Sequence, residues 1–130
     1  MFWNLVIVFV VIGFAGYTFL SSRKKEEKND FNPAFSYQLV KNGAILLDVR
    51  SKSEYDSGSI KNAVHIPYSD IRKQKDFIKN LTKNNQNQPI VVYCQSGRRS
   101  EIAKEELKNL GYTQVINHGG IDSWLEQNKD

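Results

Sequence analysis

The chain has 130 residues, which leaves room for one small domain and one short segment outside it. Its 18 Lys and Arg residues outnumber its 14 Asp and Glu residues and give a formal net charge of +4. The cations are scattered among acids, as in Lys104-Glu105-Glu106, so the charge does not favour a nucleic-acid partner. The single cysteine excludes an internal disulfide.

The amino-terminal segment is an unbroken apolar run. Residues 2–20, FWNLVIVFVVIGFAGYTFL, carry no formally charged side chain, and their number suits a helix across an apolar layer of about 30 Å. We therefore predict a transmembrane anchor helix at residues 1–20, with the membrane as the partner of residues 2–20. A cleavable signal peptide is the alternative, but it needs a positively charged start, a shorter apolar core and a small-residue cleavage site, and none of these is well formed here.

A charged segment follows the apolar run. Residues 21–30, SSRKKEEKND, are too polar for a core and are predicted to form a juxtamembrane linker. Its cations are Arg23, Lys24, Lys25 and Lys28, whereas no side-chain cation precedes the apolar run. The positive-inside rule therefore predicts a single-pass membrane protein with its carboxyl-terminal domain in the cytoplasm. There the basic cluster can contact anionic lipid head groups, and a lone cysteine stays reduced.

Residues 31–130 alternate strand-like and helical patterns, which predicts an α/β domain with a largely parallel central sheet flanked by helices. Pro33 suits the first turn of a helix that runs to Lys41. The predicted strands cover residues 44–49, about 64–66, 90–94 and 114–117.

Two further helices are expected between these strands. Ser69 should cap the first of them, whose apolar face is formed by Ile71, Ile78 and Leu81. The second follows the strand 90–94 and should end at Gly111, with a buried face formed by Ile102, Ala103, Leu107 and Leu110.

Several polar and small residues have structural interpretations. Asp48 and Arg50 close a strand, with Glu54 one helical turn beyond, and we expect them to form ion pairs or caps at a strand-to-helix turn. His65 and His118 lie far apart in the sequence, and no second thiol joins them, so we expect no metal site. There is no glycine-rich nucleotide loop, and we expect no cofactor.

The most informative residue is Cys94, which ends the apolar run 89–93 and is followed by Gln95, Ser96, Gly97, Arg98, Arg99 and Ser100. This places a thiol on a short loop beneath a helix N-terminus, where backbone N–H groups, the helix dipole and the two arginines stabilise a thiolate. A buried structural cysteine is the alternative. The polar neighbours argue against burial, and Ser100 is expected to cap the helix.

The segment 94–100 resembles the active-site loop of rhodanese-type sulfurtransferases, Cys-x-x-Gly-x-Arg-Ser. Two further motifs strengthen the resemblance, which covers about residues 31–130. Residues 44–50, with Glu54-Tyr55, Gly58, Ile60, Ala63 and Ile66-Pro67, are similar to the family's first motif, and His118-Gly119-Gly120-Ile121 with Trp124 is similar to its last. We expect the two glycines to allow close backbone packing and Trp124 to lie in the core.

The resemblance implies that Cys94 attacks the outer sulfur of a donor such as thiosulfate or a persulfide, carries it as a persulfide, and passes it to a thiol or cyanide. It also implies that Gln95, Ser96, Gly97, Arg98 and Arg99 bind the small anionic donor, with Arg99 at the family's arginine position and Arg98 at a variable one. The segment 58–63 departs from the family pattern, which puts only the local turn geometry and the choice of partner in question.

Three other activities remain as alternatives. Related cysteine phosphatases need an arginine six residues after the cysteine, where this chain has Ser100, so the loop is one residue too short for phosphate. A rhodanese-homology module that recruits a partner to the membrane would not need the intact loop. A thiol oxidised by peroxide would use the same low pKa. The sequence indicates no oligomeric state.

Overall fold

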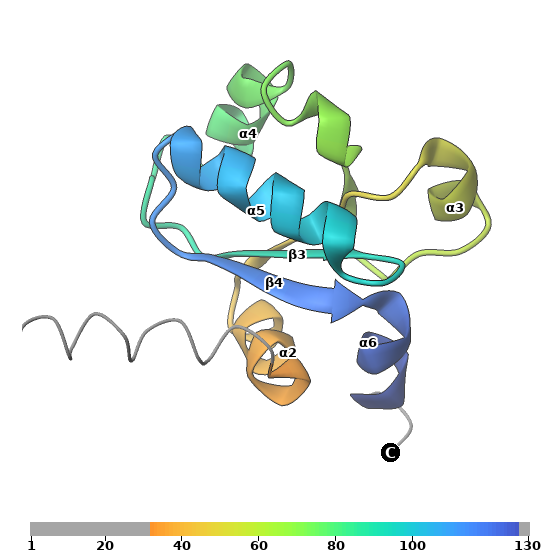
Figure 1. Ribbon diagram of the computed structural model, residues 1–130. Helices are drawn as coiled ribbons and strands as arrows, with labels where there is room; N and C mark the ends of the chain where they lie inside the picture. The colour runs from red at the N-terminus through yellow and green to blue at the C-terminus, as the bar shows by residue number, and fades with distance from the viewer. Residues whose placement is uncertain (1–31, 128–130) are drawn as a thin grey trace, which may run out of the picture. The chain divides into compact units, whose positions relative to one another are not determined.

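The computed structural model describes residues 32–127 (Figure 1). The predicted anchor at residues 1–20 and the linker at residues 21–30 lie outside the described residues. Within residues 32–127, no helix has the length and apolar character that crossing a membrane requires. The described chain runs through α2 (Pro33–Lys41), β1 (Ile45–Asp48), α3 (Lys52–Asp56), β2 (Val64–His65), the 3-10 helix η2 (Tyr68–Asp70), α4 (Lys75–Leu81), β3 (Ile90–Cys94), α5 (Arg98–Asn109), β4 (Val115–Gly120) and α6 (Ile121–Gln127).

The four strands form one sheet in the order β2-β1-β3-β4, and every neighbouring pair is parallel. Parallel strands need crossover connections, and here helices supply them on both faces. Figure 1 shows α4 and α5 over one face and α2 and α6 over the other. The predicted α/β fold with a parallel sheet flanked by helices is confirmed.

Alternation along β3 divides the interior into two cores, because successive side chains of a strand point to opposite faces. Ile90, Val92 and Cys94 face the core beneath α4 and α5, while Val91 and Tyr93 face the core above α2 and α6. All five residues are buried, as expected for a central strand covered on both sides. This alternation decides that the thiol of Cys94 points towards α5.

The boundaries of the helices correct two expectations. Asn32 caps α2 through its side chain, as its type predicts. Ser69 does not cap a helix, because it lies inside η2, and α4 begins only after Gln74. Ile102 is 44% exposed, so the buried face of α5 is narrower than predicted and consists of Ser100, Ala103, Lys104 and Leu107. Leu110 is partly buried, and Gly111 follows the helix with a positive φ, as expected.

The last strand is longer than predicted. β4 continues to Gly120, and its register against β3 shifts between Val92 and Tyr93. This irregularity brings Gly119 opposite Tyr93 and Gly120 opposite Cys94. The glycine pair therefore lies directly beside the end of β3.

A buried polar network joins β1 and β3 to the segment after α3. Asp48 and Arg50 form an ion pair with 2.7 Å between Oδ2 and Nη2, which confirms the expected pairing. The hydroxyl of Tyr93 donates to Asp48 Oδ2 at 2.6 Å and accepts the N–H of Ile60 at 3.2 Å. Arg50 also donates to the carbonyl of Gly58 at 2.7 Å. The network fixes α3 and the following turn beside the carboxyl end of β3.

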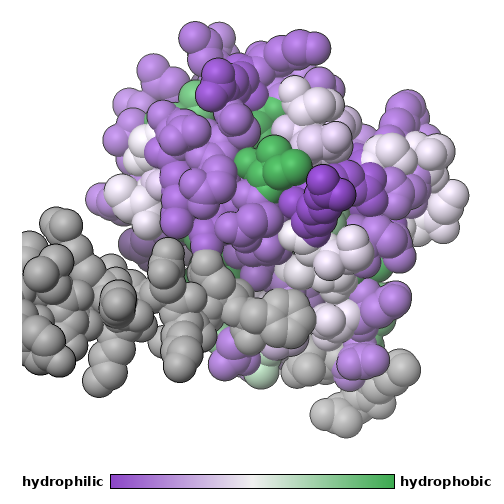
Figure 2. Space-filling model, in the orientation of Figure 1, coloured by the Kyte–Doolittle hydropathy of each residue, from purple (hydrophilic) through white to green (hydrophobic). Residues whose placement is uncertain are grey.

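The face seen in Figure 2 is mostly hydrophilic, with separate hydrophobic side chains among the polar ones. The exposed residues Ile102 and Tyr68 line one shallow hollow together with the polar residues Ser69, Arg72 and Glu106.

Candidate active site

Cys94 is the last residue of β3, and three residues, 95–97, connect it to α5. Gly97 occupies the N-cap position of α5 with φ 99°, a left-handed conformation that glycine adopts without strain. The whole Cys94 residue is buried, with no exposed area. The expectation that the polar neighbours keep it exposed is wrong, because Gln95 and Ser96 turn outward while the strand directs the thiol inward.

The sulfur lies among hydrogen-bonding groups of the loop and the first turn of α5. The N–H of Gly97 donates to Sγ at 2.9 Å, and the Ser100 hydroxyl lies 3.3 Å from Sγ. Burial opposes ionisation of the thiol, but hydrogen bonds from Ser100, Gly97 and Ser96 outweigh it and lower the pKa of Cys94. The loop therefore favours a thiolate in a site without direct contact with water.

Ser100 does not cap α5 as predicted. Gly97 is the N-cap, and Ser100 lies inside the helix, where its hydroxyl oxygen is 3.0 Å from the carbonyl oxygen of Gly97, so its single proton can point to this carbonyl or to Sγ. Its side chain is buried against Cys94. Ser100 thus belongs to the site, although the sequence indicated only a helix start.

The end of β4 packs closely against the backbone of the loop 95–97. A Cβ at Gly120 would lie 2.7 Å from the carbonyl oxygen of Gln95, and one at Gly97 would lie 3.3 Å from the Cα of Gly119. The predicted close packing at the glycine pair is confirmed. Asn117 adds a hydrogen bond from Nδ2 to the carbonyl of Gly97 at 3.1 Å. This role of Asn117 cannot be predicted from the sequence, since it depends on the strand register.

Arg99 connects the start of α5 to α3. It forms a two-point ion pair with Glu54, with 2.6 Å between Nη1 and Oε1 and 2.9 Å between Nη2 and Oε2. The hydrogen bonds from Arg99 and Ser51 hold the pKa of Glu54 at about 2. Glu54 also completes a capping box with Ser51 at the start of α3. The capping box is visible in the sequence, but the pairing with Arg99 is not.

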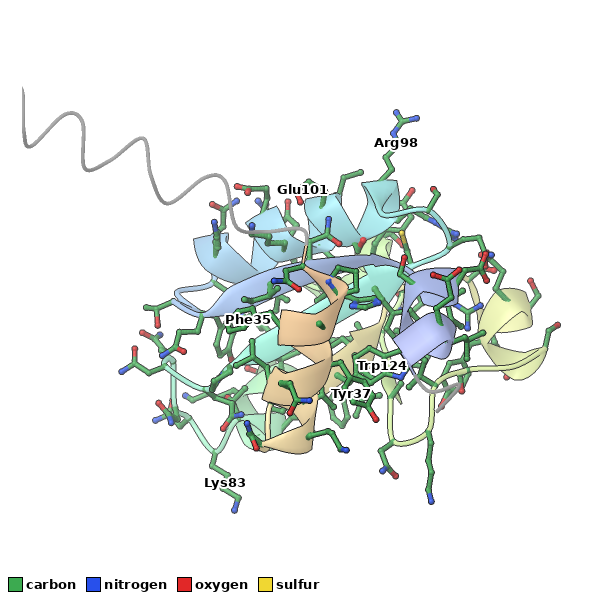
Figure 3. All side chains as sticks on the ribbon, turned by 90° about the horizontal axis from the view of Figure 1, so that it is seen from below. Phe35, Tyr37, Lys83, Arg98, Glu101 and Trp124 are labelled. Carbon is green, nitrogen blue, oxygen red and sulfur yellow. The ribbon has the colours of Figure 1, made fainter. Side chains whose placement is uncertain are left out.

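The other predicted donor-binding residues are open to solvent. Gln95, Ser96 and Arg98 are exposed, and Figure 3 shows the Arg98 side chain extending away from the body of the domain. The structure therefore brings Gly97 to the sulfur of Cys94 and leaves Arg98 at a distance from it. Of the two arginines expected to stabilise the thiolate, one is paired with an acid and the other is solvated.

The two histidines have separate environments. His65 Nε2 lies 2.8 Å from the carbonyl of Arg50, and its ring stacks on Tyr55. His118 is buried beneath the other face of the sheet, where it contacts the Ser36 hydroxyl and the edge of Trp124. Trp124 is 4% exposed, so the prediction of a core position is confirmed. Among residues 32–127, no group of three or more His, Cys, Asp or Glu side chains could hold a metal ion.

Comparison with known proteins identifies the fold and the family that the sequence motifs imply. The family model described as "Rhodanese-like domain" matches residues 33–127. A rhodanese-related protein of Thermoplasma volcanium superposes with a TM-score of 0.62 at 34% identity, covering 78% of this chain and 94% of that one. A human single-domain sulfurtransferase superposes with a TM-score of 0.61 at 29% identity, covering 73% and 92%.

Curated relatives have several names. A mitochondrial protein of Schizosaccharomyces pombe, named provisionally as a thiosulfate sulfurtransferase, is 36% identical over 63% of this chain and 61% of its own length. A tRNA uridine(34) hydroxylase of Hamiltonella defensa is 30% identical over 79% of this chain but only 32% of its own length. The chain thus spans less than two thirds of these relatives. Because the family model covers nearly all of the described residues, the chain belongs to the rhodanese-like domain family.

Proposed function

We propose that the protein is a sulfurtransferase that moves a sulfane sulfur from a donor such as thiosulfate or a persulfide to a thiophilic acceptor, with the sulfur carried on Cys94. The observation that carries the proposal is the hydrogen-bonded sulfur of Cys94 at the carboxyl end of the central strand β3. Open α/β sheets bind their ligands at this end of the strands. The sulfurtransferases among the relatives support the same assignment.

The reaction would occur in two displacements. The Cys94 thiolate attacks the outer sulfur of thiosulfate, a new S–S bond forms, the S–S bond of the donor breaks, and sulfite leaves with the bonding electron pair. An acceptor thiolate or cyanide then attacks the outer sulfur of the persulfide and restores the Cys94 thiolate. The N–H of Gly97 and the Ser100 hydroxyl stabilise negative charge at the sulfur before and after transfer. Since Cys94 is buried, the donor can reach its sulfur only after a local movement of the surrounding residues.

Two other functions make different predictions. A redox sensor would use the same lowered pKa of Cys94, but its thiolate would be oxidised by peroxide instead of receiving sulfur from a donor. A recruitment module that only binds a partner has no need of a loop that lowers the pKa of its cysteine. Turnover distinguishes them: a sulfurtransferase regenerates its thiol, a sensor is consumed, and a module does neither.

We also propose that residues 2–20 anchor the protein in a membrane as a single helix, that residues 21–30 are the linker, and that the domain faces the cytoplasm. This proposal rests on the apolar run and on the basic residues that follow it. It is tested with Ser21→Cys in a Cys94→Ser background, using a thiol reagent that does not cross membranes. Labelling from outside intact cells would reverse the proposed orientation.

The proposed reaction is tested by intact-mass measurement of the full chain in detergent after incubation with thiosulfate. We expect a gain of one sulfur atom, which cyanide or a dithiol removes. Because the chain has one cysteine, the persulfide can form only at Cys94, and Cys94→Ser is the control. If the wild-type protein gains no sulfur from thiosulfate or from a persulfide, it is not a sulfurtransferase.

A further inference from the structure

Arg99 follows the Cys94 loop, but its charge is matched by an acid. Both terminal nitrogens of its guanidinium group contact the carboxylate of Glu54. The two side chains are 29% and 31% exposed, so solvent screens the pair only in part. This carboxylate is ionised near neutral pH, and hydrogen bonds from Arg99 and Ser51 lower its pKa further. Arg99 interacts electrostatically with Cys94, and the carboxylate of Glu54 offsets much of its positive charge there.

The remaining charges around the loop are also balanced. Arg50 is paired with the buried Asp48. Glu101, in the first turn of α5, accepts a hydrogen bond from Asn117, which also holds the loop. The formal charge of Arg98 offsets that of Glu101, and the Arg98 side chain extends into solvent (Figure 3). The charged side chains named above are three cations, Arg50, Arg98 and Arg99, and three acids, Asp48, Glu54 and Glu101.

This balance matters because thiosulfate is a dianion and leaves as sulfite, a second dianion. Cations that acids have not already neutralised stabilise both dianions more strongly than neutral donors do. The site offers backbone and hydroxyl donors at the sulfur of Cys94, but the nearest arginine is already paired. An organic persulfide needs less charge compensation, because its leaving group is a single thiolate.

A polar hollow of about 310 Å³ adjoins the loop on the side of Glu54. It is lined by Arg50, Ser53, Glu54, Ser57, Gly58 and Gln95, and thus lies between α3 and the first loop residue after Cys94. Because Arg50 in this lining is paired with Asp48, the hydroxyl and carboxylate groups of the hollow suit a hydrophilic organic group better than an inorganic dianion. The hollow therefore offers a place for the carrier part of a donor whose outer sulfur reaches Cys94.

We infer that Glu54 determines donor specificity: by cancelling the charge of Arg99 it favours an organic persulfide, whose carrier occupies the hollow beside α3, over thiosulfate. The inference rests on the proposed function and names its donor class. In the transfer, the Cys94 thiolate attacks the outer sulfur of R–S–SH. The S–S bond to Cys94 forms with the proton still on the outer sulfur, and the S–S bond of the donor breaks, so that the carrier leaves as R–S⁻ and takes a proton from solvent.

The variant Glu54→Gln tests the charge of Glu54 separately from its structural role at the start of α3. Glutamine can keep the capping box with Ser51 but removes the negative charge opposite Arg99. The matched control is Asp56→Asn, which removes the same charge from the same helix at an exposed residue paired with Lys52. We expect Glu54→Gln to raise the rate constant of sulfur loading from thiosulfate about tenfold relative to loading from a persulfide, and Asp56→Asn to leave this ratio unchanged.

The test uses the full chain in detergent, with thiosulfate and the persulfide of mercaptoethanol as the two donors. The second-order rate constant for the mass gain at Cys94 is measured for each donor and each variant. If the wild-type protein is loaded but Glu54→Gln changes both rate constants by the same factor, the inference is wrong and the proposed function stands. If neither donor loads the wild-type protein, both are wrong.

A second measurement does not depend on the folding of a variant. Without net attraction for a dianion, thiosulfate loading of the wild-type protein should depend on ionic strength no more than persulfide loading does. A steep fall in the thiosulfate rate constant with added salt, without a matching fall for the persulfide, would show an unopposed positive site and overturn the inference.

Discussion

The support that β4 gives to the Cys94 loop can be tested with Gly120→Ala. The added Cβ would lie 2.7 Å from the carbonyl oxygen of Gln95, whereas ordinary contact begins at 3.4 Å, so the two must separate by about 0.7 Å (3.4 − 2.7). The nearest atom belongs to the backbone and cannot rotate away. Gly120 has no positive φ, so the effect is steric only.

The displacement has two expected consequences. Overpacking of this kind destabilises a fold by about 1–3 kcal/mol. A shift of roughly 1 Å in reacting groups lowers a rate about 100-fold, so a displacement of this size in the loop should slow the sulfur loading of Cys94 at least tenfold. Loading is followed by intact mass with thiosulfate and with a persulfide, and stability by thermal unfolding of the full chain.

Gly43→Ala is the matched control. Gly43 has φ 105° with nothing within 4 Å of an added Cβ, so alanine strains only the local backbone. Gly43 lies just before β1, at the amino-terminal ends of the strands. The Cys94 loop lies at their carboxyl-terminal ends, because all the strands are parallel. The Gly43→Ala variant should therefore lose about 1 kcal/mol of stability and load normally. If Gly120→Ala loads at the wild-type rate, β4 does not hold the loop in its reactive shape.

Three further outcomes are expected. Ser100→Ala removes a hydrogen bond to Sγ, so the pKa of Cys94 should rise and alkylation at neutral pH should slow about tenfold; an unchanged pH profile of alkylation contradicts this. Asp48→Asn leaves the buried guanidinium of Arg50 without its anion and should lower the free energy of unfolding by about 3–5 kcal/mol in denaturant titrations, whereas a loss below 1 kcal/mol would show that the pair is not needed. Burial lowers the pKa of His118 from 6.5, so the unfolded chain binds a proton that the folded chain rejects. The contribution of the buried, neutral His118 side chain to stability is complete above about pH 6.5. It declines as the pH falls towards the lower pKa that His118 has in the folded state. His118→Gln should reduce this acid dependence of thermal unfolding, and an identical dependence in both proteins would refute it.

Local patterns identified most of the secondary structure. The limits of β3 and α2 and the stop at Gly111 agree with the sequence, because apolar runs, a proline in a first turn and a glycine after a helix act within a few residues. Ser69 and Ile102 were misassigned because their surroundings come from other parts of the chain. Ser69 lies in a 3-10 turn, and no element covers Ile102 well enough to bury it.

A parallel α/β sheet with one thiol at the end of a central strand can be predicted from the amino-acid sequence, because alternation, chain order and turn residues are local properties. The surroundings of that thiol follow only from the three-dimensional fold. The burial of Cys94, the hydrogen bond from Asn117 and the pairing of Arg99 with Glu54 join segments that are distant in the chain. Such contacts depend on strand register and helix placement, which local patterns do not encode, and it is these contacts that set the charge and the access of the site.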